Sequence, residues 1–365
     1  MKTVLKKSSL SAAAGMALCF ALLPAQQAHA TAFVPCNDIQ ALKDAITDSN
    51  TTGERINLAA GCTYTLTAAD NDQNGLPVIT GNVRISSQGA TIRRSPAATD
   101  EFRIFQVDGS GSLSLTSVTV SGGRLGTATD DSGAGILNEG STTLTSATVS
   151  DNRAGFGGGG IHNDGGQLSL TRTVIENNRA TNGDLGGGIW NDAATLTMSG
   201  GALRNNISDS DGAGLENWPQ STATISGATV SGNTSTQGNG GGIDNDSVST
   251  LNLTSTTVSG NRATGGGGLR NRSSTAALVG GQVTGNTATG GPGSGGGILQ
   301  QGTGGVSLNG TVVANNTPDN CAPDGVIVGC TNPTATTSTG RTPQPESPGT
   351  KGHHLNKQLR HAHAS

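Results

Sequence analysis

Apolar and polar residues alternate in short stretches along most of the chain, and these stretches recur at a regular interval. In one of them Leu144 is followed five positions later by Val149. The same pairing returns in six further copies, whose first members are Leu170, Met198, Ile225, Leu253, Leu278 and Leu308. Period-two alternation in stretches this short predicts β-strands rather than helices.

Two motifs recur in step with the alternation. The first, Gly-Gly/Ala-Gly-Ile/Leu-x-Asn, ends at Asn138, Asn163, Asn191, Asn217, Asn245, Asn271 and Gln300, at intervals of 25 to 29 residues with a mean of 27. The second, aliphatic-x-x-Asn, ends at Asn152, Asn178, Asn206, Asn233, Asn261, Asn286 and Asn316. A unit with about three short strands and no room for a helix must bury its apolar face by stacking on its neighbours.

The sequence therefore predicts an all-β protein, a parallel β-helix with one coil per repeat over residues 76–330. Equivalent residues would form columns with a spacing of about 4.8 Å. Aliphatic columns would fill a narrow interior, asparagines would hydrogen-bond from coil to coil, and glycines would supply the positive φ angles of tight corners. The composition agrees, with 58 glycines in 365 residues and only 2% aromatic residues.

Both ends of the coil stack carry candidate closures. Asn37 or Asp38 can cap a short helix with Ile39, Leu42 and Ile46 on one face, which would cover the open end in an N-terminal cap of residues 31–75. Four cysteines remain after the first 30 residues, and their spacing favours two disulfides, Cys36–Cys62 and Cys321–Cys330, over a metal site.

The termini indicate export. Residues 1–30 read as a signal peptide, with a positive start at Lys2, Lys6 and Lys7, an apolar stretch and the cleavage pattern Ala28-His29-Ala30. We expect a secreted, extracellular protein, with retention at the cell wall left open. The mature chain would have no membrane span, and residues 331–365 would form a disordered tail. A net charge of −4 offers no basic surface for nucleic acid, and we expect a monomer.

The repeats GGGI-x-N and V-x-x-N resemble the GGAI and FxxN repeats of polymorphic outer-membrane proteins. More broadly, residues 82–316 are similar to secreted bacterial proteins of the right-handed parallel β-helix, pectate-lyase-like superfamily. This resemblance implies right-handed coiling. It also implies that an enzyme of this kind would cleave polysaccharides with carboxylates on successive coils, or with Asp-bound calcium and a basic residue.

One column of residues that point away from the core carries the most suggestive chemistry, and we call it the outward column. It runs between the aliphatic residue and the asparagine of the first motif, through Leu137, His162, Trp190, Glu216, Asp244, Arg270 and Leu299. Glu216 and Asp244 would sit about 5 Å apart, near the carboxylate spacing of a retaining glycosidase. His162, Arg270 and the sugar-stacking candidate Trp190 flank them. The alternative is an exposed, water-screened column with no cleft and no catalytic role.

Two other sets of residues suggest further functions. Acids in the turns could hold calcium, the only cofactor that the sequence suggests, although acids are also ordinary in turns; they are Asp130, Asp131, Asp184, Asp209 and Asp211. Hydroxyl pairs flank the second aliphatic column and form a flat array, similar to an ice-binding surface; they are Thr143/Thr145, Ser169/Thr171, Thr197/Ser199, Thr224/Ser226 and Asn252/Thr254. We predict a non-catalytic scaffold that presents an extended surface for adhesion or for binding extracellular polysaccharide or cell-surface polymer. The alternative is a polysaccharide lyase or glycoside hydrolase.

Overall fold

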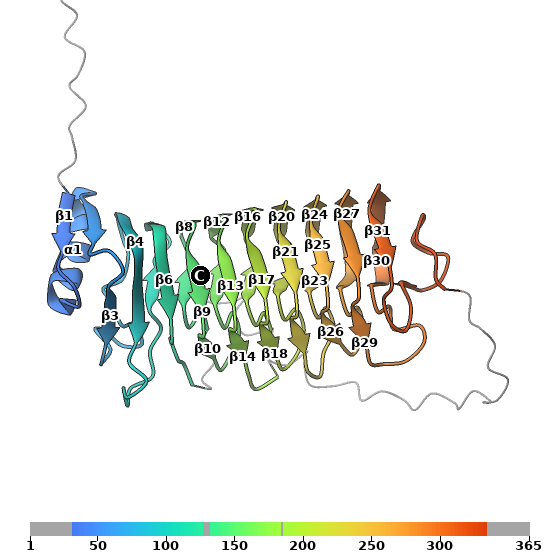
Figure 1. Ribbon diagram of the computed structural model, residues 1–365, viewed down its shortest axis with the longest axis horizontal. Coiled ribbons are helices and arrows are strands. Elements are labelled where there is room, and N and C mark those ends of the chain that lie inside the picture. The colour runs from blue at the N-terminus through green and yellow to red at the C-terminus, as the bar shows by residue number, and fades with distance from the viewer. Residues whose placement is uncertain (1–30, 127–131, 184, 334–365) are drawn as a thin grey trace, which may run out of the picture. The chain divides into compact units, whose positions relative to one another are not determined.

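A computed structural model describes residues 31–126, 132–183 and 185–333 and shows a stack of about ten β-coils. Each coil is about 28 residues long, and its strands pair in parallel with those of the coils before and after it (Figure 1). The predicted all-β parallel β-helix is thus confirmed. Residues 31–332 form one compact unit. The predicted signal peptide and nearly all of the predicted tail lie outside the described residues.

Every regular coil contains four strands, one more than the sequence predicts. The first three strands follow the two motifs, and the fourth is a two-residue strand directly after the second asparagine. The first strands are β7 (Ile136–Asn138), β11 (Ile161–Asp164), β15 (Ile189–Asp192), β19 (Leu215–Asn217) and β23 (Ile243–Asp246). The second strands are β8 (Ser141–Thr145), β12 (Gln167–Thr171), β16 (Thr195–Ser199), β20 (Thr222–Ser226) and β24 (Thr250–Thr254).

In the last two coils the first and second strands merge into the long strands β27 (Leu269–Val279) and β30 (Ile298–Asn309). The third strands are β9 (Thr148–Ser150), β13 (Val174–Glu176), β17 (Ala202–Arg204), β21 (Thr229–Ser231), β25 (Thr257–Ser259), β28 (Gln282–Thr284) and β31 (Val312–Ala314). The fourth strands are β10 (Arg153–Ala154), β14 (Arg179–Ala180), β18 (Ile207–Ser208), β22 (Thr234–Ser235), β26 (Arg262–Ala263) and β29 (Thr287–Ala288), and they form a separate six-stranded sheet.

The interior is filled as predicted. The inward aliphatic residues of the first, second and third strands form one continuous core through the stack, and they are almost completely buried in every regular coil before the last. Two asparagine ladders run along it. In one, Asn163 Nδ2 donates to Asn191 Oδ1 at 2.7 Å; in the other, Asn178 Nδ2 donates to Asn206 Oδ1 at 3.1 Å. These amides satisfy polar groups that would otherwise be buried without partners at the corners.

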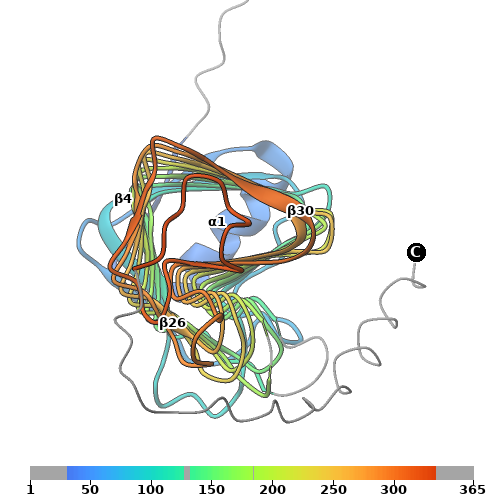
Figure 2. The same ribbon diagram turned by 90° about the vertical axis from the view of Figure 1, so that its right-hand side faces the viewer.

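The N-terminal end is closed by the predicted helix. Helix α1 (Ile39–Thr52) begins after Asp38, whose side chain accepts from the Ala41 amide, and buries Leu42 and Ile46. It packs against β4 (Asn82–Arg94) and the first three strands of the chain. In the end-on view α1 lies within the outline of the coils (Figure 2). The remaining N-terminal strands are β1 (Thr31–Val34), β2 (Arg55–Leu58), β3 (Thr63–Leu66), β5 (Phe105–Val107) and β6 (Ser112–Ser121).

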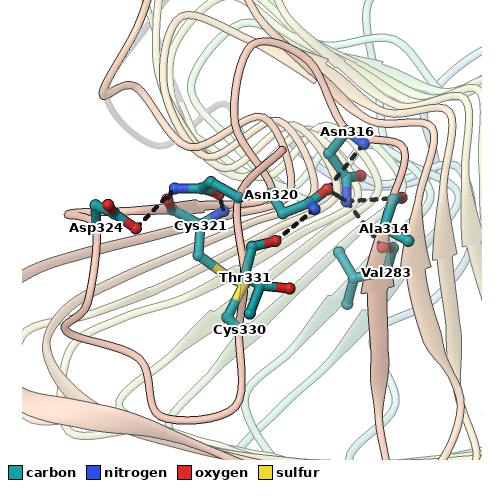
Figure 3. Close-up of a disulfide and its surroundings, with 9 residues drawn as sticks. Val283, Ala314, Asn316, Asn320, Cys321, Asp324, Cys330 and Thr331 are labelled. Carbon is teal, nitrogen blue, oxygen red and sulfur yellow. Dashed lines mark hydrogen bonds between the residues drawn. A yellow bond between two sulfur atoms is a disulfide. The ribbon is translucent and has the colours of Figure 1, made fainter. Parts of the chain in front are cut away.

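Both predicted cysteine pairs are bonded, with Cα–Cα distances of 5.5 Å for Cys36–Cys62 and 6.3 Å for Cys321–Cys330. At the C-terminal end, β32 (Cys321–Ala322) pairs with β30, and Asn320 accepts from Asn316 and extends its ladder (Figure 3). Within the described residues, no helix is long and apolar enough to cross a membrane.

Candidate functional site: the covered column

The outward column points away from the core but is not exposed. Its seven side chains lie between the first strands and the loops that follow the fourth strands, and none has more than 9% of its surface exposed. Glu216 is 2% exposed and Asp244 is completely buried. The water-screened, bare column that the sequence suggested is therefore replaced by a second buried layer. We call it the covered column from here on.

Glycine allows the loop backbone to cover this column. Four residues before Glu216 and Asp244 stand Gly212 and Gly240, both with φ near +60°. An added Cβ would lie 2.4 Å from Glu216 Oε2 at the first glycine and 2.6 Å from Asp244 Cβ at the second. The glycine segments also hydrogen-bond from coil to coil, as where the Gly240 amide donates to the Gly265 carbonyl at 3.0 Å. These short loops therefore cover the column, and they form a lobe outside the main outline of the coils (Figure 2).

Arg270 organises the charged half of the covered column. Its Nε donates to Asp244 Oδ1 at 2.7 Å, its Nη2 donates to the other oxygen of Asp244, and Nη2 also lies 3.1 Å from Asp211 Oδ2. Asp246 lies 3.7 Å from the same nitrogen and pairs with Arg272, whose Nε donates to it at 2.8 Å. Such a bidentate Arg–carboxylate pair is the strongest ionic contact that side chains make.

Acids outnumber the two arginines in this cluster. Burial and the neighbouring charges shift the pKa values of its buried members. Burial, followed by repulsion from Asp244, raises the pKa of Glu216 well above its usual value. Burial likewise raises the pKa of Asp244 to about 6, although Arg270 opposes the shift. Burial lowers the pKa of Arg270, but attraction to Asp244 and Asp211 outweighs it and raises the pKa overall. Raised pKa values in two neighbouring carboxyls are typical of catalytic acid pairs.

Neither carboxyl of this pair is accessible from solvent, unlike the catalytic groups of an open active site. Glu216 Oε2 is buried, and no residue in the described ranges hydrogen-bonds to it. The pair lies on β19 and β23 in direct register, yet the glycine loops leave neither carboxyl open to a substrate. A sugar would reach Glu216 or Asp244 only if these loops moved away.

The N-terminal half of the covered column is aromatic. His162 and Trp190, paired in register on β11 and β15, stack with ring centroids 4.2 Å apart and planes within 7°. Phe156 packs edge-on against Trp190 with centroids 5.8 Å apart. His162 Nδ1 lies 2.8 Å from Ser132 Oγ, and its Nε2 faces Asp192. Trp190 is only 6% exposed and is not available to stack on a sugar.

The turn acids predicted as calcium ligands have other contacts where they are described. Asp211 pairs with Arg270, as above, and Asp209 pairs with Arg179 at 3.1 Å. Asp130, Asp131 and Asp184 lie outside the described residues. Sequence reasoning missed the acids two positions after the covered column, in the segments IHND, IWND and IDND, although the strand alternation places them on the same face.

The second strands present a different surface, which we call the open face: the outward residues of β8, β12, β16, β20, β24 and the second halves of β27 and β30. Its hydroxyl pairs align in register from coil to coil, as with Thr197 and Thr224. It carries no charged side chain. Near its C-terminal end lies an open hollow of about 360 Å³, with Asn252, Ala277 and Ser307 in its lining.

Comparisons with known proteins found no match for this chain among family models, curated proteins or solved structures.

Proposed function

We propose that the protein is an extracellular, non-catalytic β-helix that binds neutral polysaccharide through its open face. The observation that carries this proposal is the contrast in access: the carboxyl candidates are sealed, whereas the aligned hydroxyl rows of the open face are partly or fully exposed. Two disulfides in one chain are compatible with an oxidising, extracellular setting.

The chemistry of the open face matches an uncharged polymer. Serine, threonine and asparagine side chains both donate and accept hydrogen bonds, as sugar hydroxyls do. Because the face has no charged groups, it offers no ion pairs to an acidic polymer. Its coil-to-coil repeat provides many equivalent weak contacts, and a long polymer can engage several of them at once.

Co-sedimentation with insoluble polysaccharides tests the proposal. Microcrystalline cellulose and chitin, both uncharged, serve as probes, and we expect the chain to sediment with at least one of them. A Thr143→Glu/Thr224→Glu variant places two separated charges on the open face and should lose binding. The matched control, Gln237→Glu/Thr289→Glu, adds the same charges to exposed loop positions and should bind normally. Equal binding by both variants would overturn the assignment to the open face.

The second candidate, a polysaccharide lyase or hydrolase, is favoured by one observation, the raised pKa values of Glu216 and Asp244. Release of unsaturated products or reducing ends from the same polymers measures it. If the wild type releases products and a Glu216→Gln/Asp244→Asn variant does not, the protein is an enzyme and the covered column opens in solution. If neither chain releases products, the catalytic alternative fails.

A further inference from the structure

The two ring nitrogens of His162 have different surroundings. Its side chain is 7% exposed, and Nδ1 lies at hydrogen-bond distance from Ser132 Oγ. Among the residues that the structure describes, none hydrogen-bonds to the buried Nε2. When Nδ1 carries the proton, it donates a hydrogen bond to the serine oxygen. The lone pair of Nε2 is then free and directed at the neighbouring coil. A buried imidazole in this state is a ready ligand.

Two carboxylates converge on this nitrogen. Asp192 Oδ2 lies 3.7 Å from His162 Nε2, too far for a hydrogen bond. Asp164, in register with Asp192 on the adjacent strand, provides a third atom, and the three candidate ligand atoms lie within 4.8 Å of one another. His162 is held in place by its stack on Trp190. Strand register therefore fixes a nitrogen and two oxygens around one point at the rim of the covered column.

We propose that His162, Asp164 and Asp192 form a zinc site. Imidazole and carboxylate are both common zinc ligands, with bonds of about 2.0–2.2 Å, whereas calcium takes oxygen ligands only. Ligands of a tetrahedral zinc ion lie about 3.4 Å apart, so the carboxylates would need to close in by about 1 Å. Asp164 is exposed and Asp192 is partly exposed, so both can rotate. Ser132 would orient the imidazole from behind, as residues around zinc-bound histidines do.

The proposal does not depend on the open face. It differs from the calcium expectation in its residues and in its ion: none of the five turn acids belongs to it. The exposure of Asp164 leaves the fourth coordination position accessible to water.

Isothermal titration with zinc chloride at about pH 7.5 tests the site on the full chain, since metal affinity depends on deprotonated ligands. The C-terminal segment contains four histidines, His353, His354, His361 and His363, and histidine is a common zinc ligand. All four are therefore changed to alanine, and every comparison is made in this tail variant. We expect it to bind one zinc ion and to melt at a higher temperature with zinc than without.

Substitutions in the tail variant locate the ion. Ser132→Ala should weaken zinc binding by about 10-fold, because it removes only the orienting contact. His162→Gln and Asp192→Asn should weaken it further; Asp192→Asn alone suffices if the buried substitution fails to fold. The control Asp151→Asn removes an exposed acid at a positive-φ position that asparagine tolerates, and should change nothing. No zinc binding by the tail variant, or binding unaffected by Asp192→Asn, would overturn the proposal.

Discussion

The covered column and the open face consist of consecutive strands of the same coils, with the same alternation of inward and outward residues. On the open face the outward residue meets solvent, and serine and threonine occupy it. On the covered column the outward residue meets glycine backbone, and between the leucines at its two ends it is aromatic or charged. An outward position in a β-helix is therefore not equivalent to an exposed one. The connection that precedes the strand decides whether its outward residue is buried or exposed.

The largest effect should come from Arg270, the cation that compensates the buried acids. Arg270→Met leaves Asp244 and its neighbours without their main partner, and we expect a loss of about 3–5 kcal/mol in the free energy of unfolding. Arg204→Met provides the contrast, because Arg204 pairs with Glu176 at the surface, where such a pair contributes about 0–1 kcal/mol. Urea denaturation of both variants checks this. Equal losses would mean that the covered column is solvated like the surface.

Two glycines with nearly the same φ allow a comparison between the covered column and an uncovered turn. Gly240 covers Asp244, and Gly227 joins β20 to β21 with open space around it. Gly240→Ala should cost about 2–4 kcal/mol, from crowding and backbone strain together, whereas Gly227→Ala should cost about 1 kcal/mol, from strain alone. Thermal unfolding measures both. A Gly240→Ala variant as stable as Gly227→Ala would show that the loops yield without cost and would reopen the catalytic alternative.

Glu216 supplies a pH-dependent test. Its folded-state pKa and that of Asp244 are raised, so the folded chain holds protons more tightly than the unfolded chain. The contribution of these two groups to stability should therefore rise as the pH falls from 7 towards 5. Glu216→Gln should be about 1 kcal/mol more stable than the wild type at pH 8, and the gain should shrink at pH 5. Glu176→Gln is the matched surface control. A gain that stays constant between pH 5 and 8 would contradict a buried, titrating Glu216.

The smallest effect on stability belongs to the open face. Thr224→Val should change the free energy of unfolding by less than about 0.5 kcal/mol, because the hydroxyl is exposed and valine suits a strand. Thr173 offers a buried match, because its hydroxyl donates to the Leu144 carbonyl at 3.0 Å. Thr173→Val should cost about 1–3 kcal/mol, because it removes a buried hydrogen bond. Denaturant titration of the two variants distinguishes them.

The repeat determined most of the fold. The spacing of Asn163 and Asn191, and of their counterparts, predicts the coil length, the parallel pairing and the amide ladders, because each unit can bury its aliphatic residues only against another copy of itself. The helix at Ile39 and both disulfides also followed from local patterns. Even the register was encoded, since the motifs align residue by residue.

Only the tertiary structure decided the environment of the covered column. The positions of His162, Glu216, Asp244 and Arg270 were evident from the motif, but their burial was not, because it depends on where short glycine loops lie after leaving the fourth strand. Alternation along a strand specifies which way a side chain points, and it contains no information about what covers it. That covering changes a water-screened pair of carboxyls into a buried ionic cluster.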